Sequence, residues 1–269
     1  MISEVGIAGG GLMGSAIAVV NLQACCNIVM YDTSSNQISK AKSKIDKIID
    51  QLNLSATIRY TDNISDMSNC SLIIECVSED ETVKSDIYRI IEENCARKSI
   101  IATNTSSISI NRLASNLQFP DRFLGLHFMN PPQIIKLVEI INHEKFNIKN
   151  LKQIDQYLKT LNMISIKCND KPGFIVNRVL LPMINEAIYC FESGLSDAKS
   201  IDKALKIGAN HPMGPLELAD FIGLDTCLSI LRILQKDLGD SKYKPCPLLE
   251  EYVRLGKLGR KTKEGFYKY

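Results

Sequence analysis

The stretch that decides the fold is VGIAGGGLMG, residues 5–14. Its first four residues form a short apolar run typical of a buried β-strand. Gly9, Gly11 and Gly14 follow as G-x-G-x-x-G, and small apolar residues after them predict a helix. The order strand, glycine-rich turn and helix predicts the first half of a nucleotide-binding βαβ unit.

The residue types in this turn match the needs of a bound pyrophosphate. Gly9 permits the tight turn, Gly11 lets the backbone approach the ligand, and Gly14 lets the helix pack closely on the strand. The first helical residues, Leu12 and Met13, offer free N–H groups and a partial positive charge to phosphates. We therefore expect all five residues to bind a dinucleotide.

Asp32 ends the next predicted strand, 18 residues after Gly14. Its carboxylate can accept hydrogen bonds from both ribose hydroxyls, and it would repel a 2′-phosphate. Residues 33–35 contain no arginine that could receive such a phosphate. The sequence therefore predicts NAD(H) rather than NADP(H) as cofactor, although a purely structural glycine turn is an alternative.

The rest of the chain divides into two patterns. In the first part of the chain strands alternate with helices, which predicts parallel pairing and a doubly wound sheet of the Rossmann type. The pattern changes after Pro120, where two further strands lie around the break Asn130-Pro131-Pro132. The predicted strands cover residues 28–31, 71–77, 99–103, 123–128, 137–141 and 163–168, with helices near 36–51, 81–94 and 148–161. A turn cluster at 169–173 then marks the expected boundary between a dinucleotide-binding domain, residues 1–170, and a second domain, residues 171–269. The second domain is expected to be all-helical, with helices near 174–193, 197–208, 214–237 and 246–255.

Composition excludes several classes of protein. The 269 residues carry a net charge of +2, which predicts neither a nucleic-acid footprint nor a polybasic membrane patch. No apolar run approaches the about 20 residues of a membrane span, and no signal peptide is evident. Nine cysteines without C-x-x-C spacing indicate a reducing, cytoplasmic location. The three histidines do not cluster with them, so no metal site is expected.

His127 is the candidate base for oxidising an alcohol. It ends a predicted strand on the side of the sheet where ligands bind in open α/β folds. Glu139 lies 12 residues on, in the next predicted strand, and could orient the imidazole. Spacing alone leaves a structural histidine and an ordinary strand-end carboxylate as alternatives.

Several long motifs occur in order over almost the whole chain. They are TNTSS (103–107), DRFLGLHFMNP (121–131), KLVE (136–139), KPGFIVNR (171–178), HPMGPLEL (211–218), GLDT (223–226) and EGFY (264–267). Together they resemble the signature of the 3-hydroxyacyl-CoA dehydrogenase family. The resemblance implies NAD-dependent oxidation of a 3-hydroxyacyl thioester to the 3-ketoacyl thioester, or the reverse, as in fatty acid metabolism.

The same resemblance implies four catalytic roles. His127 would be the general base, and Glu139 would hold it in place. Ser106 would hydrogen-bond the reacting oxygen or the thioester side, and Asn177 would orient the substrate. Ser106 as a turn or helix cap and Asn177 as a cap or bridge between helices are the structural alternatives.

On the cofactor side, the resemblance implies further contacts. Glu79 and Lys84 match the family's nicotinamide-ribose contacts, while Asn104 and Asn130 lie on loops that line the same cleft. Lys261, near the C-terminus, is expected to reach it too. Lys84 as an ordinary solvated helix residue is the alternative.

The sequence departs from the family pattern between Asp32 and Ser71, which only 38 residues separate. The family usually carries a longer stretch there, with a helical excursion beside the nucleotide end of CoA. Neutral loop shortening is the simplest explanation. The other is that the acyl group arrives on an acyl carrier protein, as in polyketide extender-unit biosynthesis. Four lysines of the remaining helix, at positions 40, 42, 44 and 47, could then meet the acidic carrier, unless they form only a solvated face.

Two other functions stay open from sequence. The first is a catalytically silent NAD-binding protein. The second is a dehydrogenase for a free hydroxy acid, a class that usually relies on a lysine where Asn177 stands. Apolar residues within 224–234 suggest a homodimer formed by the helical domain, and a core helix explains the same pattern.

Overall fold

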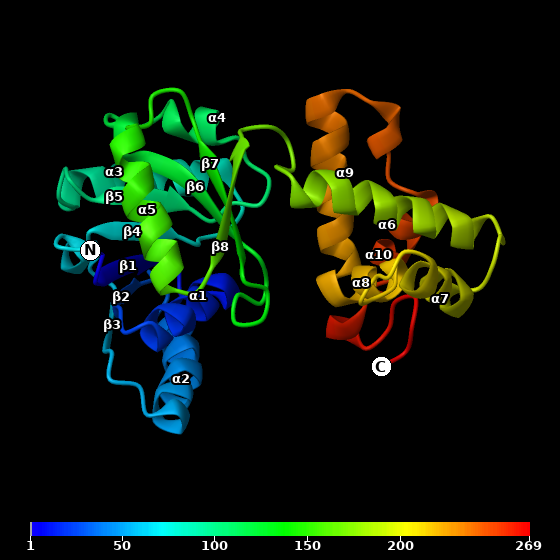
Figure 1. The fold of residues 1–269 in the computed structure, drawn as a ribbon, viewed down its shortest axis with the longest axis horizontal. Helices are drawn as coiled ribbons and strands as arrows, with labels where there is room; N and C mark the ends of the chain where they lie inside the picture. The colour runs from blue at the N-terminus through cyan, green and yellow to red at the C-terminus, as the bar shows by residue number, and fades with distance from the viewer. Residues whose placement is uncertain (1) are drawn as a thin grey trace. The chain divides into compact units, whose positions relative to one another are not determined.

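The structure, a computed structural model, describes residues 2–269. The chain forms two compact units, Met1–Lys171 and Pro172–Tyr269 (Figure 1). Each unit has its own hydrophobic core. The Rossmann-type sheet followed by a helical part is confirmed.

The first unit is built on one eight-stranded sheet in the order β3-β2-β1-β4-β5-β6-β7-β8 (Figure 1). The strands are β1 (Glu4–Ala8), β2 (Asn27–Tyr31), β3 (Ile58–Thr61), β4 (Leu72–Glu75), β5 (Ile100–Thr103), β6 (Phe123–Phe128), β7 (Leu137–Asn142) and β8 (Ile164–Asn169). All neighbouring strands are parallel except β6 and β7, which are antiparallel. No helix joins these two strands, so the chain simply reverses between them.

Helices cover both faces of this sheet. They are α1 (Leu12–Gln23), α2 (Ser35–Leu52), α3 (Glu81–Asn94), α4 (Ile110–Ala114) and α5 (Ile148–Thr160). Leu124 and Leu126 of β6 share a buried core with residues of α1, α2 and α5. Phe123, which alternates with them and points to the opposite face, packs edge-on against Tyr88 of α3 with ring centres 4.9 Å apart. The inner strands are therefore buried on both faces, which explains their near-continuous apolar sequences, whereas the edge strands β3 and β8 are partly exposed.

The second unit is helical. It contains α6 (Val176–Glu192), α7 (Ala198–Gly208), α8 (Pro215–Ile222), α9 (Leu224–Leu238) and α10 (Pro247–Arg254). The single helix predicted over 214–237 is wrong, because Gly223, at φ +102°, breaks it into α8 and α9. A backbone conformation of this kind favours glycine and cannot continue an α-helix.

The apolar residues of α9 face inward. Leu224, Leu231 and Leu234 are fully buried in the core of the helical unit itself. Reading this segment as a surface for a second copy is therefore wrong, and the core helix accounts for the pattern. Within residues 2–269, no helix is long and apolar enough to cross a membrane.

Candidate active site

The glycine-rich turn lies between β1 and α1, and packing fixes two of its glycines. Gly9 has φ +112°, and a Cβ there would lie 2.6 Å from the carbonyl oxygen of Cys76. A Cβ at Gly14 would lie 1.9 Å from the carbonyl oxygen of Gly9. A Cβ at Gly11 would meet nothing within 4 Å. The first two positions thus serve the turn and the close packing of α1, whereas the third leaves an open approach to the backbone.

Asp32 is tied to this turn. Its Oδ2 accepts a hydrogen bond from the Gly10 N–H at 2.8 Å, and its Oδ1 accepts one from the Ser34 N–H at 2.8 Å. Each oxygen retains acceptor capacity for a further donor, such as a ribose hydroxyl. At the N-terminus of α1, Gly11 supplies no side-chain cap, so the first N–H groups of the helix can serve an anion. The residues present therefore fit a dinucleotide.

A hollow of about 240 Å³ opens beside the turn. Its walls come from α1, α2 and Gln133, whose side-chain amide donates to the Ala16 carbonyl oxygen at 3.1 Å. Lys40 and Lys44 of α2 also line it. The hollow thus adjoins the glycine turn on the side of the lysine-bearing helix.

His127 and Glu139 are brought together by the antiparallel pair β6 and β7. They are directly opposite each other in the strand register. The His127 Nδ1 lies 2.7 Å from the Glu139 Oε2, and both side chains are buried. The carboxylate therefore orients the ring, and a proton held on Nδ1 leaves the lone pair of the neutral imidazole on Nε2.

Asn104 links the end of β5 to β6, the strand that carries His127. It follows β5, and its side-chain oxygen accepts a hydrogen bond from the Phe128 N–H at 2.9 Å. Phe128 directly follows His127, so Asn104 steadies the end of β6. Asn130 is exposed, in the connection between β6 and β7.

Glu79 organises the loop that carries Ser106. Its carboxylate accepts hydrogen bonds from the Thr105 hydroxyl at 2.6 Å, the Ser106 N–H at 3.0 Å and the Ser107 hydroxyl at 2.9 Å. Burial alone would raise the pKa of Glu79, but the Lys84 ammonium and these donors outweigh it and lower that pKa. Glu79 is therefore held as a carboxylate.

Lys84 lies inside the unit rather than on a solvated helix face, so that alternative reading is wrong. The side chain is 1% exposed, and its Nζ lies 2.7 Å from Glu75 and 3.4 Å from Glu79. Burial would lower the pKa of Lys84, but the two carboxylates outweigh it and raise that pKa. Lys84 thus joins two acidic groups as a buried cation.

Glu75 is a polar residue that the sequence reasoning missed. It ends β4 and is fully buried, where it accepts from Lys84, from the Val77 N–H at 2.7 Å, from Thr103 at 2.8 Å and from the Tyr88 hydroxyl. The available signal was a carboxylate ending the apolar run LIIE, since a buried acid requires partners.

Two predicted residues belong to the helical unit. Asn177 lies in the first turn of α6 and is buried. Lys261 lies in the short 3-10 turn Arg260–Thr262 and pairs with Asp225. The structure thus places Asn177 and Lys261 in a different unit from the His127–Glu139 pair.

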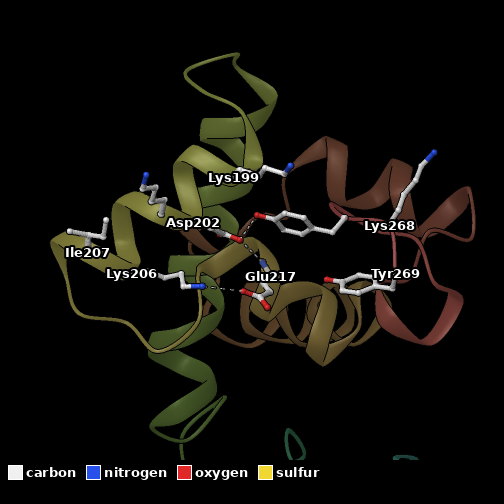
Figure 2. A pocket seen from close by; sticks show the side chains of 9 residues that line it. Lys199, Asp202, Lys206, Ile207, Glu217, Lys268 and Tyr269 are labelled. Carbon is white, nitrogen blue, oxygen red and sulfur yellow. Dashed lines mark hydrogen bonds and ion pairs between the residues drawn. The ribbon is translucent and has the colours of Figure 1, made fainter.

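The helical unit also has a hollow of about 570 Å³ (Figure 2). Lys199 and Lys206 of α7 line one side, and Lys268 and Tyr269 line the other (Figure 2). Between them, Asp202 accepts hydrogen bonds from two N–H groups of the first turn of α8, at 2.8 and 2.9 Å. None of the predicted site residues lines this hollow.

Comparisons with known proteins agree over the full chain. Residues 4–171 match the NAD binding domain of 3-hydroxyacyl-CoA dehydrogenase, and residues 173–269 match its C-terminal domain. The chain is 43% identical to the 3-hydroxybutyryl-CoA dehydrogenase of Bradyrhizobium diazoefficiens, covering 100% of this chain and 96% of the relative. It is 40% identical to the probable 3-hydroxybutyryl-CoA dehydrogenase of Deinococcus radiodurans, covering 98% and 99%.

A solved structure shows the same fold. The crystal structure of M. tuberculosis FadB2 superposes with a TM-score of 0.95 at 33% identity and covers 100% of this chain and 99% of that one. With both domain models and full-length relatives in agreement, the chain belongs to the 3-hydroxyacyl-CoA dehydrogenase family, and its first unit is the NAD-binding domain of that family.

Proposed function

We propose that this protein oxidises a 3-hydroxyacyl-CoA thioester to the 3-ketoacyl-CoA thioester with NAD+, or runs the reverse reaction. The observation that carries the proposal is the buried His127–Glu139 pair at 2.7 Å in a domain that binds NAD. Relatives named as 3-hydroxybutyryl-CoA dehydrogenases support the thioester as substrate.

His127 acts as the general base in the proposed mechanism. Its Nε2 takes the proton of the 3-hydroxyl group, and the positive charge that forms on the ring is stabilised by Glu139. When NAD+ is bound, it supplies the acceptor for the hydride that leaves C3. In the reverse direction, protonated His127 returns the proton to the oxygen.

The remaining site residues bind and orient the reactants. The pyrophosphate of NAD is held by the turn residues Gly9, Gly11, Leu12, Met13 and Gly14. The Asp32 carboxylate accepts hydrogen bonds from the hydroxyls of the adenosine ribose. The nicotinamide end of the cofactor is bound by Glu79, Lys84, Asn104, Asn130 and Lys261. Ser106 and Asn177 hold the thioester substrate.

The decisive experiment measures NADH absorbance with acetoacetyl-CoA, and NAD+ reduction with 3-hydroxybutyryl-CoA. The panel adds longer acyl chains and the free hydroxy acid. We expect turnover of the CoA thioesters. If NADH binds but no hydroxyacyl or ketoacyl substrate turns over, the catalytically silent NAD-binding alternative is favoured instead.

A second candidate keeps the chemistry and changes the carrier. Only residues 53–57 connect α2 to β3, so the chain has no helical excursion there. Lys40, Lys42, Lys44 and Lys47 of α2 are all exposed, and an acidic acyl carrier protein would complement them. Turnover of one acyl group on CoA and on a carrier protein decides between the carriers, and equal or better turnover of the CoA form excludes the carrier idea.

We also propose a homodimer formed by the helical unit. The support comes from large apolar side chains that this unit leaves exposed: Val179, Leu195, Ile207, Phe221 and Leu255. A cytoplasmic location is proposed on the nine cysteines, which are all free thiols.

A further inference from the structure

Glu75 contacts Lys84, one of the residues proposed to bind the reactants, but is not itself proposed to bind them. It is fully buried at the end of β4, and its two oxygens accept hydrogen bonds from four donors. Donors on this many sides hold the carboxyl group in one orientation. Glu75 is therefore an acidic group with a fixed position at the centre of the sheet.

Lys84 links Glu75 to Glu79. Its ammonium, 1% exposed, lies between Glu75 at 2.7 Å and Glu79 at 3.4 Å. A buried ammonium is costly without a partner, and Glu75 is the nearer and fully buried of the two. Glu75 thus keeps Lys84 charged and pointed at Glu79.

Glu79 completes the chain of contacts. The loop 105–107 donates to it through the Thr105 and Ser107 hydroxyls and through the Ser106 N–H. The position of Glu79 therefore sets the position of Ser106. An uninterrupted series of ion pairs and hydrogen bonds runs from Glu75 through Lys84 and Glu79 to this loop.

We infer that Glu75 is a positioning residue of the active site, which acts through Lys84 to hold Glu79 and the Ser106 loop in place for the cofactor and the substrate. The inference rests on the proposed function for the roles of Glu79, Lys84 and Ser106. Glu75 itself is covered by protein and touches neither reactant. Its removal should therefore weaken binding indirectly, mainly through Lys84, although Glu75 also bonds the Thr103 hydroxyl, which accepts from the Thr105 N–H at 3.2 Å.

The charge on Glu75 can be tested by Glu75→Gln, which keeps an acceptor oxygen of similar shape. Lys84 then keeps only Glu79 as a carboxylate partner, with the Cys76 thiol as the other titratable group facing it. Only Glu79 then opposes the effect of burial, so the pKa of Lys84, raised in the wild type, should fall below its ordinary value in the variant. Between about pH 7 and 9.5, below the ordinary lysine pKa, the variant should lose about 10-fold in NADH affinity as pH rises, while the wild type stays flat.

Tyr88→Phe is the matched control. It removes another hydrogen bond to the same carboxylate and leaves the pair between Glu75 and Lys84 in place. It should lower the melting temperature without making NADH affinity depend on pH. A second control places Glu75→Gln in a Lys84→Met background, where it should cause no further loss of affinity.

NADH binding followed by fluorescence keeps this test separate from turnover. A protein that binds NADH as described but turns over no thioester contradicts the proposed function and leaves the inference standing. The inference is overturned if Glu75→Gln binds NADH like the wild type at every pH, if Tyr88→Phe shows the same pH-dependent loss, or if the effects of Glu75→Gln and Lys84→Met add. If Glu75→Gln does not fold, Glu75→Asp, which keeps the charge, must bind NADH with no pH dependence for the inference to hold.

Discussion

At the scale of single residues, His127 should carry the largest loss of activity. His127→Asn removes the base, so kcat should fall by ~10²–10⁴-fold, while NADH affinity changes little. His143→Asn is the control, because His143 is also buried in the first unit but bonds only backbone carbonyl oxygens through its Nε2. Steady-state kinetics at pH 7.5 separate the two variants. A His127→Asn enzyme with near-wild-type kcat removes this residue from the mechanism.

Asp32 should decide which dinucleotide binds. The wild type is expected to bind NADH about 10- to 100-fold more tightly than NADPH, because the carboxylate repels a 2′-phosphate and accepts ribose hydroxyls. Asp32→Asn should narrow this ratio while keeping an acceptor for the Gly10 N–H. Fluorescence titrations with both cofactors measure it. Equal affinities of the wild type for the two cofactors refute the assignment.

At the scale of elements, three neighbouring glycines should respond differently to one added methyl group. Gly14→Ala forces α1 away from the turn, so both the melting temperature and NADH affinity should fall. Gly11→Ala has room in the protein but stands where the pyrophosphate approaches, so only NADH affinity should fall. Gly10→Ala meets its nearest atom at an ordinary 3.5 Å and should change neither. Thermal melts and NADH titrations of all three variants test this pattern, and equal effects at positions 10 and 11 contradict it.

How far the sequence predicts these elements depends on how strongly each one is marked. The strands at the centre of the sheet are short apolar runs between turn signals, so they were predicted. The edge strand β3, IRYT, was missed, because it is four residues long, only partly buried and carries an exposed arginine. Gly223 was hidden within an apolar periodic run, since its positive φ is visible only in the structure.

The site shows the same division. The turn from Gly9 to Gly14 and Asp32 form one local pattern with a known spacing, so both are readable from sequence. The register that places His127 opposite Glu139 cannot be predicted from the sequence, because the eight residues between β6 and β7 do not fix which residues pair. Glu75 escaped for a related reason, since its partners come from α3 and β5 and only tertiary packing gathers them.

At the scale of the whole molecule, burial of His143 should make stability depend on pH. Burial lowers the pKa of His143 below its ordinary value, and the hydrogen bonds to Phe123 and Pro120 only partly offset this. Near pH 6.5 His143 therefore binds a proton in the unfolded chain but not in the folded chain. Its contribution to the free energy of unfolding is fully present above that pH and is lost as pH decreases. The free energy of unfolding from urea titrations at pH 7.5 and 5.5 should drop less in His143→Gln than in the wild type, by at most about 1.4 kcal/mol per pH unit. Identical drops in the two proteins rule out this contribution.

The proposed homodimer can be tested on exposed side chains that match in size and exposure but belong to different units. Leu195 and Ile207 of the helical unit are each 73% exposed, as is Ile148 of the first unit. Placing a carboxylate within an apolar interface leaves an unpaired, desolvated charge, so a dimer formed by the helical unit should be weakened by Leu195→Glu or Ile207→Glu. Ile148→Glu should leave it intact. Light scattering after size-exclusion chromatography measures the mass directly. The proposed dimer is refuted if the wild type is a monomer, or if Ile148→Glu alone dissociates the dimer. The exposed apolar residues of the helical unit would then have another role.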